Sequence, residues 1–440
     1  MTEPAVRLTQ RRILRFWSPL AATWLMMAAE GPFLAAVIAR LGDPAYNLAA
    51  FGVAMAIAMI VEAPVIMMMS AATALVRDRQ SLLALRRFAW RLNAAVTVVM
   101  LVVLLPPVFR FVGLDVLGLP GPVERLAHQG VAVLVFWPAA IGYRRFYQGL
   151  LIRHHLTRRV AWGTVVRLAT MTITALVLSG TTSASGASVG AGALALGVIV
   201  EAAASRVMAR GVARELLGRE GDPREALTGA AIVRFYAPLA VTSLLLLGIQ
   251  PLLTFFLARG RMPLESLAVL PVVNGLLFML RAPGIGFQEA ALALAGERPE
   301  NVPALRRFAT TLGVTLAGTL VVVAFTPLAR LWFEGVTGLP EALATLAILP
   351  TRLLVALPAL EVWLALQRAL LLVDRTTRPI TVATSLEVAV LAAALALLSG
   401  PLGLVGIVAV GVALPLGRIA ANLYLQGRLR ASRPAGAARS

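Results

Sequence analysis

The chain has 440 residues, of which 59% are hydrophobic, and its mean hydropathy is +0.84. These values exclude an ordinary soluble globule, because the apolar runs are long enough to cross a bilayer repeatedly. The formal charge of +19 comes from 40 basic residues, all arginine, against 21 acidic ones. The arginines fall in short clusters between apolar segments and not on one face, so we expect no nucleic-acid partner.

Catalytic and metal-binding groups are scarce. The chain contains no cysteine, which excludes disulfides, thiolate metal sites and cysteine nucleophiles. Its three histidines, His128, His154 and His155, are predicted at loops or helix ends. No carboxylate-rich metal motif and no phosphate-binding glycine loop occurs in the sequence. We therefore expect a protein that is not an enzyme and that needs neither a metal nor another cofactor.

The apolar runs predict membrane-spanning helices. About 20 apolar residues are needed for each span, and backbone groups in lipid must be satisfied within the segment, which favours helices over barrel strands. Twelve spans are predicted, which makes the fold class an all-α polytopic membrane protein. Their ranges are 13–39, 46–76, 92–114, 123–151, 160–181, 189–210, 231–258, 264–296, 306–332, 341–373, 378–399 and 402–427.

The loops alternate between arginine-rich and nearly neutral. Linkers such as 77–91 and 153–159 are rich in arginine, whereas 182–188 and 400–401 carry no charge. Because cytoplasmic loops carry the excess of arginine, this alternation places both termini in the cytoplasm, in a cytoplasmic (inner) membrane. The stretch 79–91 is basic and amphipathic, and we expect it to lie on the inner leaflet as a separate helix.

The second half of the chain repeats the first. Pro32–Arg40 matches Pro251–Arg259 at an offset of 219, and Leu85–Phe88 matches Leu305–Phe308 at an offset of 220. Six helices per copy give both copies the same orientation, so we expect two bundles related by a pseudo-two-fold axis along the membrane normal. The predicted parts are an N-terminal six-helix bundle (1–215), a cytoplasmic linker (216–229), a C-terminal six-helix bundle (230–427) and a disordered, Arg-rich cytoplasmic tail (428–440).

Two matched positions of the repeat carry opposite charges. Glu62 corresponds to Arg281, and Arg167 corresponds to Glu387. Charges are costly in lipid, so these side chains should face an interior seam, a cavity or each other. One interpretation is a pair of gates formed across the two halves and broken in another conformation. The other is that each charge pairs permanently within its own half and only fixes the packing.

Further polar residues are candidates for transport. Glu30, in the outer half of the first helix, could bind a coupling proton or cation, could reach the outer interface, or could form a buried structural pair. Arg352 follows Pro350 near the midplane, where a guanidinium can hold an anionic substrate or satisfy carbonyls freed by the proline. Gln250 and Asn274 could line a cavity or cleft together with Glu62 and Arg281.

The remaining intramembrane charges are interpreted as structural. Arg144 and Arg145 are expected to snorkel toward the cytoplasmic end of their helix. Glu201, Arg206 and Arg418 are expected to form packing pairs or snorkelling helix ends.

The pattern of repeated six-helix units resembles the multidrug/oligosaccharidyl-lipid/polysaccharide exporter (MOP) superfamily, which includes the multidrug and toxin extrusion (MATE) transporters. More narrowly, Ala50–Ala54, Glu62-Ala63-Pro64, Arg77-Asp78-Arg79 and Pro350–Leu353 followed by Pro358 look like the progressive ankylosis (ANK) family. The resemblance implies two six-helix bundles with a cleft lined by helices 1, 2, 7 and 8.

The resemblance also implies a function. MATE-like extruders export by rocker-switch motion and often place their coupling acid in helix 1, where this chain offers Glu30. ANK-type relatives are associated with efflux of organic anions, which would suit Arg281 and Arg352. The hypothesis is a monomeric secondary active transporter in the lipid bilayer that exports a small organic solute, an organic anion or a drug-like compound, coupled to H⁺ or Na⁺. A flippase for a lipid-linked precursor is the alternative.

Overall fold

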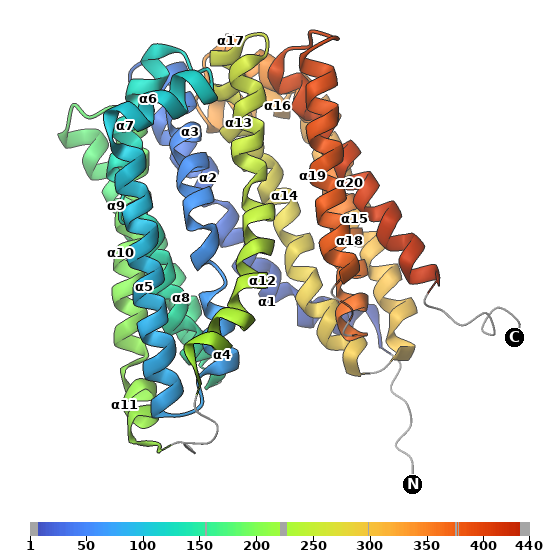
Figure 1. Ribbon diagram of the computed structural model, residues 1–440. Helices are drawn as coiled ribbons and strands as arrows, with labels where there is room; N and C mark the ends of the chain where they lie inside the picture. Colours follow the sequence, from blue (N-terminus) through green and yellow to red (C-terminus); the bar gives the residue numbers. More distant parts are fainter. Residues whose placement is uncertain are drawn as a thin grey trace, which may run out of the picture. The chain divides into compact units, whose positions relative to one another are not determined.

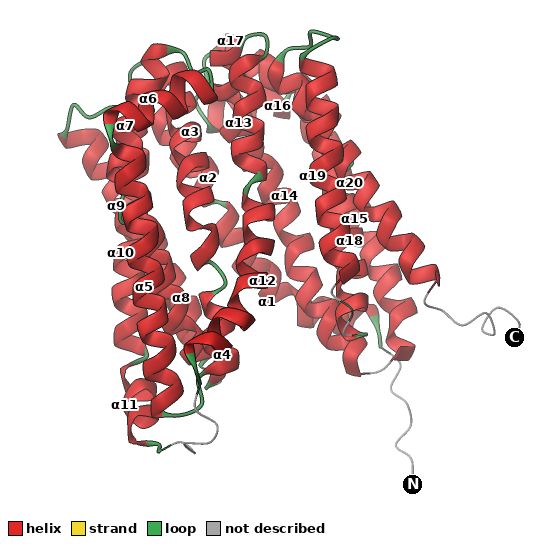
Figure 2. Cartoon of the chain, viewed as in Figure 1, coloured by secondary structure: helices red, strands yellow, loops and turns green. Residues whose placement is uncertain are grey.

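The computed structural model describes residues 8–154, 156–220, 227–297, 299–374, 376 and 378–431. The regular structure in these residues is helical, apart from one isolated bridge between Arg261 and Val405 (Figure 2). The predicted all-α class is therefore confirmed. The apolar helices follow one another along the chain with short connections (Figure 1).

The number of candidate spans agrees with the sequence prediction. Within the described residues, 11 helices are long and apolar enough to cross a membrane, and a twelfth span is gained if one bent pair is joined. That pair is Glu341–Leu353 and Leu357–Val373, which meet at 44°. Pro358 stands at the start of the second helix, where its missing N–H costs no helical hydrogen bond. This break explains why the sequence shows one span where the structure has two helices.

The helices form two compact units. Unit 1 contains residues 1–33, 260–262 and 269–440, and unit 2 contains residues 34–259 and 263–268. The helices of unit 1 are α1 (Gln10–Ala28), most of α14 (Pro263–Glu297), α15 (Val302–Phe325), α16 (Leu328–Arg330), α17 (Glu341–Leu353), α18 (Leu357–Val373), α19 (Arg378–Ser399) and α20 (Gly406–Ala431).

Unit 2 contains the remaining α-helices, including most of α2, which crosses the boundary between the units. They are α2 (Glu30–Ala39), α3 (Pro44–Glu62), α4 (Met68–Leu75), α5 (Arg79–Leu104), α6 (Pro106–Arg110), α7 (Gly121–Val133), α8 (Trp137–Arg153), α9 (Thr157–Thr181), α10 (Gly186–Met208), α11 (Arg210–Gly218), α12 (Gly229–Leu247) and α13 (Ile249–Arg259).

The first helix of each repeat packs with the rest of the other repeat. In unit 1, Ile13 of α1 is fully buried in a cluster with Phe287 and Leu305. In unit 2, Ile232 and Tyr236 of α12 are buried against residues of α4 and α5. The packing units thus differ from the predicted sequence segments 1–215 and 230–427, which remain a prediction about the extent of the repeat. The sequence did not indicate this exchange of first helices.

Two hydrogen bonds at matched positions of the repeats hold the exchanged helices α1 and α12 in place. The Trp17 indole Nε1 donates to the carbonyl oxygen of Pro283 at 2.9 Å. The Tyr236 hydroxyl donates to the carbonyl oxygen of Pro64 at 2.5 Å. Trp17 and Tyr236 are matched at the offset of 219, and so are Pro64 and Pro283. The same contact is therefore built twice, once in each unit.

A second feature occurs at the same place in both repeats. The π-helix Phe111–Val116 of unit 2 corresponds to the π-helix Leu331–Val336 of unit 1 at the offset of 220. Each is followed by a glycine with positive φ, +71° at Gly118 and +72° at Gly338, a conformation that glycine adopts without steric cost. The local geometry thus supports the internal duplication.

The arginine-rich stretch 79–91 is not a separate helix, which corrects the sequence prediction. It continues into the next span as the single helix α5. The helix starts sharply because the Asp78 carboxylate accepts the N–H of Ser81 at 2.9 Å, and the Ser81 hydroxyl accepts the N–H of Asp78 at 3.0 Å. No helix breaker follows before Pro106, so the chain has no reason to turn at residue 91.

The linker and the tail are described only in part. The helix α11 (Arg210–Gly218) crosses the predicted linker boundary at residue 215, and α12 begins at Gly229. Helix α20 extends to Ala431, which places the first residues of the predicted disordered tail in a helix. The rest of the tail, 432–440, and the linker residues 221–226 lie outside the described residues.

Candidate functional site

Unit 2 contains a cluster of charged side chains from four helices, α3, α8, α9 and α10. Glu201 lies at its centre and is 1% exposed. It is ion-paired with Arg144, and Arg167 Nε lies 3.4 Å from its Oε2. Gln148 donates to the other carboxylate oxygen at 3.1 Å. This shared carboxylate holds three helices together. The members of the unit 2 cluster are Glu62, Arg144, Arg145, Arg167 and Glu201.

Glu62 belongs to this cluster without forming an ion pair with a described residue. It is the last residue of α3, is 6% exposed, and lies in the electrostatic field of Arg145, Arg144 and Arg167. Arg145 has no carboxylate partner within the described chain either, and its guanidinium contacts the Met69 sulfur at 3.7 Å. The backbone explains the position of Glu62, because Pro64 ends the α-helix in a short 3₁₀ turn, Ala63–Val65.

Unit 1 contains a corresponding cluster from α14, α18, α19 and α20. Arg281 Nε donates to Glu361 Oε2 at 2.8 Å, and Arg418 Nη1 lies 3.1 Å from the same oxygen. Arg418 also reaches Glu387, with Nη2 2.9 Å from Oε1. Arg368 donates to the Thr384 hydroxyl at 3.3 Å. The members of the unit 1 cluster are Arg281, Glu361, Arg368, Glu387 and Arg418.

The two clusters have the same charge but a different arrangement. Each contains three arginines and two glutamates, which gives a formal charge of +1. Among the cluster members, only Glu62 with Arg281 and Arg167 with Glu387 are matched positions that are charged in both repeats, and both pairs are inverted in sign. In each cluster one arginine, Arg145 or Arg368, has no carboxylate partner among the residues that the structure describes. A buried charge without a counter-charge is costly, so the excess positive charge calls for a functional explanation.

The predicted gate residues are each placed within one unit. Arg281 pairs with Glu361, Glu387 pairs with Arg418, and Arg167 approaches Glu201. In this conformation these three therefore have partners inside their own unit, which agrees with the second of the two interpretations offered above. Whether Glu62 and Arg281, or Arg167 and Glu387, pair across the repeats in another conformation stays a prediction.

The sequence interpretation missed some members of the clusters. Glu361 and Arg368 were not singled out, although both interrupt the long apolar helix α18. Arg144 was expected to snorkel, and this was wrong, because it is 5% exposed and bound to Glu201. Seven residues separate Glu361 from Arg368, which places them on one helical face, and this spacing was the available signal.

The other predicted site residues lie apart from the two clusters. Arg352 is exposed, donates from Nε to the carbonyl oxygen of Ala324 at 3.0 Å, and lies over the Phe325 ring. This carbonyl belongs to α15 and is not one that Pro350 frees. Gln250 is half-buried in α13.

Glu30 and Asn274 belong to one contact region of unit 1. Glu30 is half-buried at the start of α2, where a break at Ala29 separates it from α1. The next residue, Gly31, packs against Gly275, and a Cβ added at Gly275 would lie 3.0 Å from Pro32. Asn274, half-buried, adjoins this close contact and forms no hydrogen bond with the described part of the chain.

Comparisons with known proteins identify the fold. Neither a protein-family model nor a curated protein sequence matches the chain. An inward-facing multidrug resistance MATE transporter of the MOP superfamily superposes with a TM-score of 0.78 at 15% identity, covering 97% of this chain and 98% of that one. The lipid II flippase MurJ gives a TM-score of 0.71 at 12% identity, covering 94% and 88%. A MOP superfamily transporter from Pyrococcus furiosus, described as having a binding pocket of reverse polarity, gives 0.64 at 15% identity, covering 97% of both chains. The chain therefore has the fold of the MATE-like transporters of the MOP superfamily.

Proposed function

We propose that this protein is a secondary active transporter that exports a small organic solute across the cytoplasmic membrane by alternating access. The MATE-like fold and its internal duplication support this proposal, because transporters commonly move two repeats against each other around a site between them. The protein would act as a monomer with both termini in the cytoplasm, coupled to H⁺ or Na⁺.

One observation carries the proposal, namely the pair of hydrogen bonds from Trp17 to Pro283 and from Tyr236 to Pro64. Each joins the first helix of one repeat to the second helix of the other. Both lie near the arginine-rich helix ends that are predicted to be cytoplasmic, next to Arg15 and Arg234. Each bond lies inside one compact unit, so it holds the first helix of one repeat to the unit that contains most of the other repeat. We name these four residues the proline latch.

The charge clusters adjoin the proline latch. Arg281 precedes Pro283 by two residues, and Glu62 precedes Pro64 by two residues. A change in the charge balance of either cluster would therefore act on the backbone that accepts the latch hydrogen bond. In this mechanism the clusters and the latch residues together keep each unit rigid while the units alternate between their two arrangements.

The excess positive charge of both clusters supports an organic anion as the solute. A guanidinium without a carboxylate partner can bind a carboxylate or phosphate group bidentately. Arg145 and Arg368 are the arginines in this situation among the described residues. An anionic solute also fits the resemblance to the ANK family, which we propose as the closer relationship within the superfamily. A drug-like compound is the other solute class within this proposal.

The remaining assignments are part of the same proposal. Glu30 would hold the coupling ion, since it is a half-buried carboxylate at the break between two helices. Arg352, Gln250 and Asn274 would face the solute together with Glu62 and Arg281.

Transport in proteoliposomes tests the function. Vesicles with an imposed proton or sodium gradient would be loaded with organic anions or cationic drugs. We expect gradient-dependent movement of an organic anion. Failure to move any solute of the panel under either gradient would contradict the proposal.

The proline latch is tested with Trp17→Phe and Tyr236→Phe, which remove the donors and retain an aromatic side chain. Each lost hydrogen bond is worth about 0.5–1.5 kcal/mol, so amide hydrogen exchange around Pro283 and Pro64 should accelerate roughly 2- to 13-fold. Trp162→Phe and Tyr46→Phe are matched controls, because neither side chain has a hydrogen bond within the described chain. Unchanged exchange together with unchanged transport in the latch variants would contradict the mechanism.

Flipping of a lipid-linked precursor is the second candidate function, and the similarity to the lipid II flippase favours it. The same vesicles can carry a fluorescent lipid-linked sugar in place of the soluble anion. Movement of the lipid without movement of any soluble solute would replace the first proposal by this one.

A further inference from the structure

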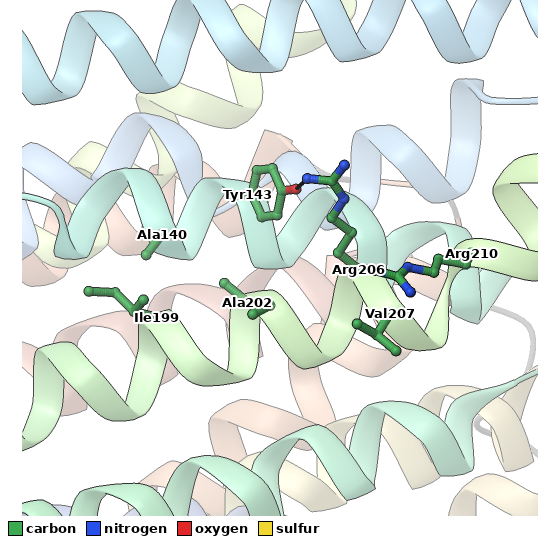
Figure 3. Close-up of a pocket in the computed structure, with 8 residues that line it drawn as sticks. Ala140, Tyr143, Ile199, Ala202, Arg206, Val207 and Arg210 are labelled. Atoms are coloured by element: carbon green, nitrogen blue, oxygen red, sulfur yellow. Dashed lines mark hydrogen bonds between the residues drawn. The ribbon is translucent and has the colours of Figure 1, made fainter.

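A groove lies on unit 2 between α8 and α10 (Figure 3). Its volume is about 520 Å³, within the range of roughly 300–1,000 Å³ for small-molecule sites. Most of its wall is apolar, whereas its polar side chains gather at one end. It is lined by Ala140, Tyr143, Ile199, Ala202, Ala203, Arg206, Val207 and Arg210.

Two arginines occupy the polar end of the groove. Arg206 and Arg210 are exposed and stand one helical turn apart, at the end of α10 and the start of α11. Arg206 donates to the Tyr143 hydroxyl at 3.0 Å, and Figure 3 shows this side chain turned toward the tyrosine ring. Neither arginine is ion-paired with a carboxylate of the described residues. The C-terminal end of α10 favours cations, but two guanidiniums at this spacing still repel each other.

Aromatic rings mark the same end of unit 2. The Tyr143 ring lies 5.6 Å from Trp90 and 4.9 Å from Tyr147, measured between centroids. Trp90 is 57% exposed, and Arg86 of α5 lies in the same region, close enough to act electrostatically on Tyr147. Tryptophan and tyrosine favour the depth of the lipid headgroups, where the ring is half in hydrocarbon and half in water. The arginines of the groove are therefore placed at headgroup depth, and its apolar wall extends toward the bilayer interior.

We propose that this groove is a binding site for an acidic glycerophospholipid. The phosphate lies on Arg206 and Arg210, whose mutual repulsion it relieves, and Tyr143 orients Arg206 toward it. An acyl chain lies along the small side chains Ala140, Ala202 and Ala203, which leave room between the two helices. A soluble anion would use the arginines but not the apolar wall, so the lipid explains both parts of the groove.

The repeat provides an internal comparison. The positions in unit 1 that match Tyr143, Arg206 and Arg210 are Trp363, Gln426 and Arg430. The side chain of Gln426 accepts a hydrogen bond from Gln367 of α18 at 3.1 Å. The second repeat therefore lacks the pair of arginines, and the site is expected in unit 2 only.

Native mass spectrometry and thermal unfolding of the full-length protein in detergent test this proposal, with phosphatidylglycerol and phosphatidylcholine as probes. We expect phosphatidylglycerol to be retained and to raise the melting temperature more than phosphatidylcholine. Each arginine near the membrane surface contributes a factor of about 5 to the affinity for acidic lipid, so Arg206→Gln with Arg210→Gln should weaken binding about 30-fold. The matched control is Arg428→Gln with Arg430→Gln, which removes the same charge from exposed positions on α20 and should leave binding unchanged.

A second variant separates the lipid from a free anion. Ala203→Trp fills the apolar groove from an exposed position and keeps both arginines. It should abolish retention of phosphatidylglycerol. Equal retention of the two lipids, an equal loss in the α20 control, or stabilisation by glycerol 3-phosphate as strong as by phosphatidylglycerol would overturn the proposal.

Discussion

At the scale of single residues, the buried ion pairs depend on which arginine each glutamate meets. Glu361 forms ion pairs with both Arg281 and Arg418, whereas Glu201 forms them with Arg144 and Arg167. The charged residues could be located in the sequence, but their partners come from helices far apart in the chain. An interaction over 80 or 57 residues leaves no local pattern that predicts it.

Removing one buried carboxylate should destabilise the protein strongly. Glu361→Gln leaves Arg281 without its counter-charge and removes one of the two carboxylates that Arg418 contacts. We expect a loss of about 3–5 kcal/mol in the free energy of unfolding. Glu215→Gln is the control, because Glu215 and Arg219 form an exposed pair with side-chain exposures of 55% and 59%. That change should cost less than about 1 kcal/mol. Reversible unfolding in mixed micelles measures both, and equal losses would show that the cluster is not structural.

At the scale of elements, the two π-helices Phe111–Val116 and Leu331–Val336, here called the π-helical corners, are packed with different side chains. Unit 2 has Phe109 and Gly113, whereas the matched positions of unit 1 are Ala329 and Phe333. Each corner thus buries one phenylalanine, shifted by one helical turn, and both rings are fully buried. The space opposite differs accordingly, because Glu124 in unit 2 corresponds to Ala344 in unit 1.

The corner of unit 2 should reject a side chain at Gly113. A Cβ there would lie 2.9 Å from Glu124 Cγ, so Gly113→Ala should lower the free energy of unfolding by about 1–3 kcal/mol. Adding Glu124→Ala, the residue type found in unit 1, should recover part of this loss in a double-mutant cycle. Gly318→Ala, with nothing within 4 Å, should be neutral or stabilising. Additive losses in the cycle would refute the packing explanation.

At the scale of the whole molecule, the duplication and the arginine distribution define the path of the chain. Both repeats carry a π-helix and a latch hydrogen bond at matched positions, so the two copies follow similar paths. The exchange of the first helices is visible only in the packing, where Ile13 and Ile232 are each buried in a cluster of residues from the other repeat.

Cysteine labelling can check the predicted orientation, because the chain contains no native cysteine. Single cysteines at Ser183 and Pro401, both exposed in neutral loops, should react with a membrane-impermeant maleimide in intact cells. Cysteines at Gln80 and Glu220, exposed in arginine-rich segments, should react only after the membrane is opened. The reverse pattern would mean that the arginine-rich segments lie outside the cell, and it would place the proline latch on the outer side.

The sequence by itself determined the class of the fold, the duplication and the charged positions. Hydropathy and helix length are local properties of the sequence. The constant offset of 219 or 220 residues between the two copies of the repeat can also be found from the sequence without a structure. Only the tertiary structure decided that Arg281 meets Glu361, that Arg144 is buried, and that each first helix packs on the other repeat. The reason is physical, because an apolar helix carries the same pattern whichever neighbour covers it. The neighbour is selected by the fit of side chains that lie far apart in the chain.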